Sequence, residues 1–298
     1  MATGDSGATR PRLVDMMSHM QLYAKKSLGQ HFLNSRHVLE QIIAAAELAK
    51  GDNVLEIGPG TGILTEALLE TGANVLAIEK DERAIGLLQT KFEVASHSGR
   101  LKVIEGDILN AQCPIPNTQF SVVANIPYYI TGAILEKFLE HEPRPTQMVL
   151  LVQKEVAERI IASDGKESIL SISVKAFGTP RLIAKVPRGA FTPAPTVDSA
   201  ILSISNISNG RFTGNNVDIK WFFALVRAGF AHKRKFLIRN IEEIADQGDI
   251  AVQNDAVPNI SAEKLREVWE NLGFDPKIRA EDLNIDKWLL LAAKLAQS

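Results

Sequence analysis

The sequence contains a single cysteine, Cys113, among 298 residues. One thiol cannot close an intramolecular disulfide or build a cysteine-rich zinc site, so the cytoplasm is the expected compartment. The six histidines show no metal-ligand spacing such as H-E-x-x-H, and no metal is expected. No apolar run approaches the ~20 residues that span a bilayer, and residues 1–20 lack the apolar centre of a signal peptide. We therefore expect a cytoplasmic protein without a membrane partner. A monomer is also expected.

A strong net charge is also lacking, because 33 basic and 35 acidic side chains leave a net charge of −2. The overall charge therefore gives no sign of a nucleic-acid partner. Local charge is more informative, since residues 231–239 form a dense basic segment that includes Lys233, Arg234 and Lys235. Such a run is either a solvated helix surface or part of a binding face, and the run alone does not decide between them.

Length and composition are typical of a soluble globular protein with about two domains. Residues 1–21 are polar and rich in small side chains, and we expect a disordered tail there. Residues 205–216 are rich in Asn, Ser and Gly, which predicts a linker. The linker would separate an α/β domain at residues 22–206 from a smaller, all-helical domain at residues 207–298.

Short apolar, β-branched runs alternate with helical patterns through the α/β domain. Strands are expected at residues 54–57, 75–78, 101–104, 120–124, 148–152, 181–186 and 199–205. Helices are expected at residues 37–50, up to 70, 82–95, 132–140 and 155–177. This alternation predicts a Rossmann-like parallel sheet covered by helices on both faces. Ligands of such sheets bind at the carboxyl ends of the strands, so the residues that follow each strand are the candidate site.

A glycine-rich turn, Glu56-Ile57-Gly58-Pro59-Gly60-Thr61-Gly62, follows the first strand and opens a helix. Dinucleotides, phosphates and S-adenosylmethionine all bind to turns of this kind. A dinucleotide fingerprint has a small residue at its last position, where this chain has Ile63, and no P-loop is present. The turn therefore favours S-adenosylmethionine.

Two acids stand at the ends of the next strands. Glu79 can accept hydrogen bonds from both ribose hydroxyls, and Asp107 can accept one from an adenine amine. Either acid alone is most simply a solvent-facing residue at a strand end. Two acids at successive strand ends behind a glycine-rich turn indicate a nucleoside site.

The Asn125-Ile126-Pro127-Tyr128 sequence follows the fourth strand. The Asn125 side-chain oxygen and the Ile126 carbonyl can accept the two N–H groups of an adenine amine, while Pro127 stiffens the turn. Such alignment can lower a barrier by ~7–11 kcal/mol at best. Tyr128 would stack on a flipped-out base. Phe191 is the candidate for a second stacking face, or else a core residue beneath a proline-rich turn.

With these motifs in order, the chain resembles the bacterial small-subunit (16S) rRNA adenine dimethyltransferases, the KsgA/RsmA family. The likeness covers residues 22–298 and also includes the Lys25–Leu33, Phe191–Ser199 and Lys233–Asn240 segments. It implies a class I methyltransferase sheet with a helical C-terminal domain. The residues implied to contact S-adenosylmethionine are His31, Leu33, Gly58, Gly60, Glu79, Asp107 and Asn125. Tyr128 and Phe191 would sandwich the adenine.

The resemblance further implies dimethylation of N6 on two adjacent adenosines in a hairpin loop near the 3′ end of 16S rRNA. Lys233, Arg234 and Lys235 would hold the RNA, and the enzyme would act on the small subunit or its precursor during ribosome biogenesis.

Three alternatives are weaker. The related large-subunit rRNA methyltransferases that confer macrolide resistance share the cofactor motifs, but Asp198 before Ser199 favours the small-subunit group. DNA adenine methyltransferases have Pro where this chain has Ile126. A binding protein without methyltransferase activity would have no need of Asn125 and Tyr128, and this chain has both.

Overall fold

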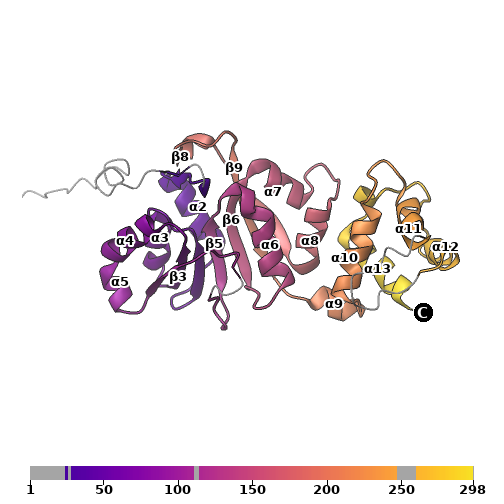
Figure 1. The fold of residues 1–298 in the computed structure, drawn as a ribbon, viewed down its shortest axis with the longest axis horizontal. Helices are drawn as coiled ribbons and strands as arrows, with labels where there is room; N and C mark the ends of the chain where they lie inside the picture. The colour runs from indigo at the N-terminus through magenta and orange to yellow at the C-terminus, as the bar shows by residue number, and fades with distance from the viewer. Residues whose placement is uncertain (1–23, 26–27, 111–113, 247–259, 298) are drawn as a thin grey trace, which may run out of the picture.

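The computed structural model describes residues 24–25, 28–110, 114–246 and 260–297. The tail expected at residues 1–21 lies outside this part of the chain, as does Cys113. The described chain forms an α/β domain followed by a group of C-terminal helices (Figure 1). A seven-stranded sheet of order β4-β3-β2-β5-β6-β9-β7 forms the centre of the first domain.

All seven expected strands are present, with ends within about two residues of those expected. They are β2 (Asn53–Ile57), β3 (Asn74–Glu79), β4 (Leu101–Glu105), β5 (Ser121–Asn125), β6 (Gln147–Gln153), β7 (Thr179–Val186) and β9 (Ser199–Ser205). Neighbouring strands from β4 to β6 run parallel, whereas β9 is antiparallel to both β6 and β7. The predicted α/β sheet is therefore confirmed, with an antiparallel pair at one edge.

Helices cover both faces of this sheet (Figure 1). On one face lie α2 (Arg36–Ala46), α3 (Ile63–Glu70), α4 (Glu82–Lys91) and α5 (Glu93–His97); on the other lie α6 (Thr131–Glu140), α7 (Lys154–Ile161) and α8 (Ile169–Phe177). Successive strand residues point to opposite faces, so Leu55 and Val54 enter separate apolar clusters. Burial on both faces explains why the central strands β5 and β6 are mostly apolar rather than alternating.

Three predicted helices differ from those observed. The prediction of one helix at residues 155–177 is wrong, because this stretch forms two helices, α7 and α8. Gly165 between them has a φ of +76°, and Ser168 caps the start of α8 by accepting the Ser171 N–H. The helix expected at residues 37–50 ends at Ala46, since Glu47 adopts the left-handed conformation with a φ of +46°. The helix expected at residues 82–95 is divided into α4 and α5.

The C-terminal part is helical, as expected. Its helices are α9 (Gly210–Asn215), α10 (Ile219–Gly229), α11 (Leu237–Asp246), α12 (Ala262–Asn271) and α13 (Ile285–Ala296). The linker expected at residues 205–216 is instead a packed connection that contains α9. Phe212 on α9 is 2% exposed and lies 5.1 Å from the Phe177 ring on α8 and 5.3 Å from the Phe222 ring on α10. One aromatic side chain thus joins the cores of both parts.

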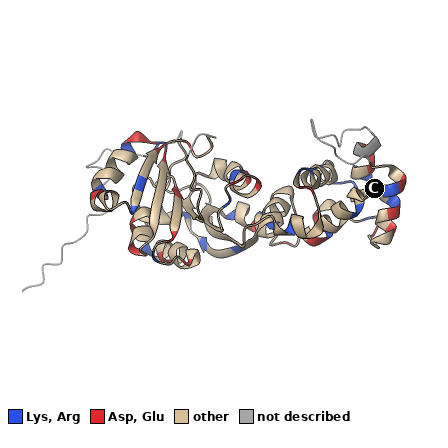
Figure 2. Cartoon of the chain, turned by 90° about the horizontal axis from the view of Figure 1, so that it is seen from below, with Lys and Arg blue, Asp and Glu red and all other residues tan. Residues whose placement is uncertain are grey.

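Charged residues are interspersed along both parts in the view of Figure 2, in keeping with the small net charge. Among the described residues, no helix combines the length and hydropathy that crossing a membrane requires.

We expect Phe212→Ala to lower the free energy of unfolding by ~3–5 kcal/mol, because it removes the ring that packs between the two parts. Phe212→Leu, which keeps much of the apolar volume, should lower it less. Denaturant titration of both variants measures the difference. Wild-type stability in Phe212→Ala would mean that this segment is a simple linker.

Candidate active site

A pocket of about 220 Å³ lies at the carboxyl ends of the parallel strands. Strand order reverses between β2 and β5, which is where open α/β sheets place their ligands. The pocket is lined by residues of the segments 28–33, 56–64, 78–80, 106–109 and 125–130. The candidate residues that follow successive strands in the sequence are therefore brought to one place.

The turn after β2 requires glycines because its backbone has positive φ values and because side chains at two of its positions would collide with neighbouring residues. Gly58, Gly60 and Gly62 have φ values of +65°, +54° and +75°, which other residues adopt rarely. A Cβ on Gly60 would lie 3.0 Å from the Phe32 ring, and one on Gly62 would lie 2.7 Å from Leu88. A Cβ on Gly58 would meet nothing within 4 Å, so this backbone faces open space and a ligand can approach it closely.

Glu79, at the end of β3, is held by the backbone around it. Its side chain is buried and accepts the N–H groups of Gly60 at 3.0 Å, Lys80 at 2.8 Å and Asp81 at 2.9 Å. Burial raises the pKa of Glu79, and these hydrogen bonds oppose that rise. Each carboxylate oxygen can accept more than one hydrogen bond, so Glu79 can also accept hydroxyl groups of a bound ligand.

Asp107, just after β4, is half-buried at the same pocket. It accepts a hydrogen bond from Lys80 Nζ at 2.8 Å and another from the Leu109 N–H at 3.0 Å. The hydrogen bond from Lys80 lowers the pKa of Asp107, followed by that from the Leu109 backbone. Asp107 therefore remains an ionised hydrogen-bond acceptor at the pocket.

Glu56, on β2, is a pocket-lining acid to which the sequence analysis assigned no role. It is 1% exposed and accepts a hydrogen bond from Thr65 Oγ1 at 2.7 Å, while its Oε1 has no partner among the described residues. Burial raises the pKa of Glu56 to about 8. An acidic residue within an otherwise apolar buried strand was the signal that could have identified it.

The Asn125 side chain has a defined orientation. Its Nδ2 donates to the main-chain oxygen of His31 at 3.0 Å. Because a carbonyl oxygen can only accept, the amide nitrogen must face His31, which leaves Oδ1 as the acceptor. Ile126 is buried beneath the turn, and Pro127 has the extended φ and ψ of −58° and 132°. The Tyr128 hydroxyl lies 2.6 Å from Ser199 Oγ, which fixes the half-buried ring at the pocket.

The segment 28–33 lies over the pocket. Phe32 and Leu33 form β1 (Phe32–Leu33), which pairs antiparallel with β8 (Phe191–Thr192), a two-stranded sheet that the sequence analysis missed. His31 Nδ1 lies 2.8 Å from the main-chain oxygen of Pro193. His31 and Leu33 both line the pocket, as the cofactor assignment requires.

Phe191 is the one predicted pocket residue that does not line this pocket. It is 3% exposed and packs in the apolar cluster on the α2 side of the sheet. Its role as a stacking partner of the base therefore stays a prediction.

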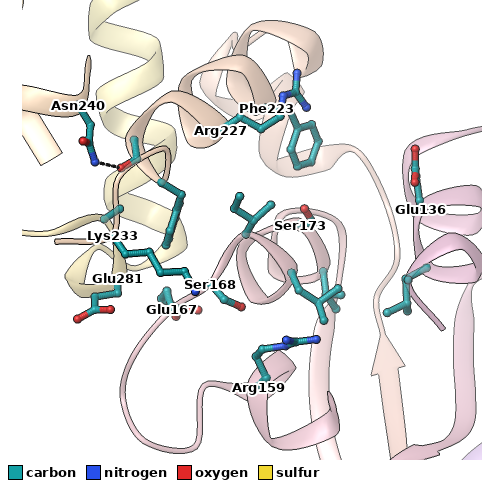
Figure 3. Close-up of a pocket in the computed structure, with 18 of the residues that line it drawn as sticks. Glu136, Arg159, Glu167, Ser168, Ser173, Phe223, Arg227, Lys233, Asn240 and Glu281 are labelled. Carbon is teal, nitrogen blue, oxygen red and sulfur yellow. Dashed lines mark hydrogen bonds between the residues drawn. The ribbon is translucent and has the colours of Figure 1, made fainter. Parts of the chain in front are cut away.

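The basic residues Lys233, Arg234 and Lys235 are exposed between α10 and α11. Lys233 and Lys235 line a second cavity of about 620 Å³ between the C-terminal helices and helices α6 to α8. Arg159 and Arg227 line it from α7 and α10 (Figure 3). The basic run thus lies at an opening between the two parts of the molecule. In the described part of the chain, no group of His, Cys, Asp and Glu is arranged to hold a metal ion.

We expect the Glu56→Gln variant to gain stability relative to the wild type as pH rises. The raised pKa of about 8 means that folding favours the protonated Glu56, so its contribution is full below about pH 4.5 and falls towards pH 8. The variant keeps the shape and cannot ionise. Denaturant titrations from pH 5 to 8 measure the difference in free energy of unfolding, and a constant difference would contradict the burial effect.

Comparisons with known proteins show which family the chain belongs to. The family model described as "Ribosomal RNA adenine dimethylase" matches residues 21–267. The chain is 40% identical to Ribosomal RNA small subunit methyltransferase A from Dehalococcoides mccartyi, over 95% of this chain and 92% of that protein. It is 38% identical to the protein of the same name from Thermosynechococcus vestitus, over 92% and 97%.

Solved structures agree. A dimethyladenosine transferase from Plasmodium falciparum superposes with a TM-score of 0.72 at 29% identity, covering 88% of this chain and 96% of that one. The 23S rRNA methyltransferase ErmE superposes with a TM-score of 0.68 at 24% identity, covering 89% and 100%, which shows a shared fold. The chain therefore belongs to the ribosomal RNA adenine dimethylase family.

Proposed function

We propose that this protein transfers methyl groups from S-adenosylmethionine to N6 of two adjacent adenosines near the 3′ end of 16S rRNA. The products would be N6,N6-dimethyladenosines, made during biogenesis of the small ribosomal subunit. The observation that carries the proposal is the Asn125 amide, which is fixed by the His31 carbonyl at a pocket that also holds Glu79 and Asp107. The name shared by the bacterial relatives favours the small subunit as the substrate.

The pocket residues fit S-adenosylmethionine. When bound, the cofactor supplies a methyl group on a sulfonium, which is the electrophile. Glu79 would accept the ribose hydroxyls and Asp107 the adenine amine, while Gly58 and Gly60 keep the backbone open to the ligand. His31 and Leu33 would close the pocket from the segment 28–33, and Asn125 would border the methyl group.

Asn125 and Ile126 would align the nucleophile. The amine of adenine is neutral and its lone pair is delocalised into the ring, so it needs orientation more than a strong base. Oδ1 of Asn125 and the Ile126 carbonyl would accept its two N–H groups and direct the lone pair at the methyl group. Alignment of this kind is worth ~7–11 kcal/mol at best.

The target adenine must leave its helix or be unpaired already, because the pocket is too small for a duplex. Tyr128 would stack on the extruded base and return ~1–3 kcal/mol. The helical domain at residues 207–298 would hold the RNA through Lys233, Arg234 and Lys235. Lys233 and Lys235 line the second cavity, and Arg234 and Lys235 line a separate, more open hollow. We expect the enzyme to act in the cytoplasm as a monomer on the small subunit or its precursor.

Mass spectrometry of 16S rRNA tests the proposal. Cells without this gene should lack both N6,N6-dimethyladenosines near the 3′ end. The wild-type gene should restore them and Asn125→Ala should not, because the amine loses its acceptor.

The matched control is Asn74→Ala, which removes an exposed side-chain amide. Asn74 lies at the amino end of β3, whereas the pocket lies at the carboxyl ends of the strands. This variant should restore both modifications. Dimethyladenosines that persist without the gene, or that return with Asn125→Ala, would overturn the proposed function.

A further inference from the structure

Asp81 is a buried acid beside the candidate active site to which the proposed function assigns no role. It follows Lys80 after the end of β3, and its side chain is 1% exposed. The carboxylate caps α4 by accepting the Arg83 N–H at 3.3 Å. It also accepts the Arg83 side chain, from Nε at 2.9 Å and from Nη2 at 2.6 Å. These bonds leave it able to accept a further donor, since a carboxylate has about four acceptor sites.

The further donor is Gln30, in the segment 28–33 that lies over the pocket. The hydrogen bond from the Arg83 side chain lowers the pKa of Asp81, so the carboxyl is ionised near neutral pH. Gln30 Nε2 donates to Asp81 Oδ2 at 3.1 Å, and Gln30 Oε1 accepts the Lys25 N–H at 2.9 Å. A backbone N–H can only donate and a carboxylate can only accept, so both ends of the Gln30 amide have a defined partner.

The Gln30–Asp81 hydrogen bond joins two parts of the candidate active site. The Asp81 N–H donates to Glu79 Oε1 at 2.9 Å. The residue after Gln30 is His31, whose main-chain oxygen accepts Asn125 Nδ2 at 3.0 Å. One hydrogen bond therefore completes a connection from Glu79, at the end of β3, to Asn125, at the end of β5.

The segment 28–33 has little regular structure of its own to hold it in place. Its strand β1 has two residues and pairs with the two residues of β8. Phe32 adds an apolar contact, because it lies in a cluster with Ala84 and Leu87 of α4. Asp81 caps the same helix, so a polar and an apolar contact both attach the segment to α4.

We propose that Gln30 and Asp81 are positioning residues, whose hydrogen bond holds the segment 28–33 in place over the cofactor pocket. Through this segment they set the position of His31 and the orientation of the Asn125 amide. The inference rests on the proposed function and extends it to residues that act through others. A cofactor that contacts the segment binds only the protein in which the segment is in place, so its apparent affinity falls with that fraction.

Two substitutions remove the hydrogen bond from opposite ends. Gln30→Met keeps the length of the side chain and loses the amide. Asp81→Ser keeps an oxygen that caps α4, since serine is a favoured N-cap residue, but is one atom too short to reach Gln30. A double variant combines the two. The matched control is Gln89→Met, at an exposed glutamine of α4.

The variants are compared in two measurements. Calorimetry gives the affinity for S-adenosylmethionine. Hydrogen exchange of the backbone amides of residues 32–34, without the cofactor, reports whether the segment is in place, because the Asn34 N–H donates to the Ala190 main-chain oxygen at 2.9 Å. Denaturant titration checks that each variant is folded. Gln30 lies outside the helices and strands, so Gln30→Met still tests the inference if Asp81→Ser does not fold.

We expect each single variant to bind the cofactor roughly three- to tenfold more weakly and to exchange these amides faster, the effect of one partly exposed hydrogen bond. The double variant should lose no more than the weaker single variant, because both substitutions remove the same bond. Gln89→Met should match the wild type. In methyl transfer to unmethylated small subunits, KM for the cofactor should rise more than kcat falls, since saturating cofactor favours the segment in place.

The contrary results are distinct. Wild-type cofactor affinity or wild-type amide exchange in either folded single variant would overturn the inference and leave the proposed function intact. Additive losses in the double variant would do the same, because the two residues would then act separately. A wild-type protein that binds no S-adenosylmethionine would overturn the proposed function, whereas the exchange measurement would still decide whether Gln30 and Asp81 hold the segment.

Discussion

The hydrogen bond from Asn125 to the His31 main chain connects the two halves of the candidate active site. One half is built on the sheet and comprises the glycine-rich turn, Glu79 and Asp107. The other is the segment 28–33, which reaches the pocket through β1. Because the amide nitrogen is occupied, Asn125 offers its oxygen as an acceptor, and an acceptor is what an adenine amine requires. In the proposed function, this orientation of Asn125 is what aligns the amine of the target base.

Three carboxyl groups at this pocket occupy different environments. Glu56 is buried with one oxygen unpaired, and its pKa is raised to about 8. The pKa of Glu79 is also raised by burial, although three backbone N–H groups favour its ionised form. The pKa of Asp107 is lowered by its hydrogen bond with Lys80. Three similar side chains therefore have different pKa values because their burial and hydrogen-bond partners differ.

Much of this site could be predicted because its residues follow strands, and each strand is recognisable from a short run of apolar residues. Runs such as Val54–Ile57 indicate buried parallel strands, and parallel strands end at one edge of a sheet. That argument brings Gly58, Glu79, Asp107 and Asn125 together, and the structure confirms their common pocket. Family resemblance added His31 and Leu33, which no local pattern indicates.

Local sequence patterns could not predict the contacts between segments that are far apart in the chain. The β1–β8 pair joins residues about 160 positions apart, and it decides that Phe191 faces the core while His31 faces Tyr128. Phe212 is one of only two apolar side chains in residues 205–216, so composition predicted a linker where packing forms a helix. The cavity beside Lys233 depends on how the C-terminal helices pack on α6 to α8.

A crystal structure of the complex with S-adenosylhomocysteine tests the central claim most directly. The account predicts the ribose at Glu79 and the sulfur facing Asn125, with its amide nitrogen still bonded to His31. A methyl group on that sulfur would then lie within about 3–3.5 Å of an amine held by Oδ1. A ligand bound in the cavity beside Lys233, or an Asn125 side chain turned away from the sulfur, would contradict it.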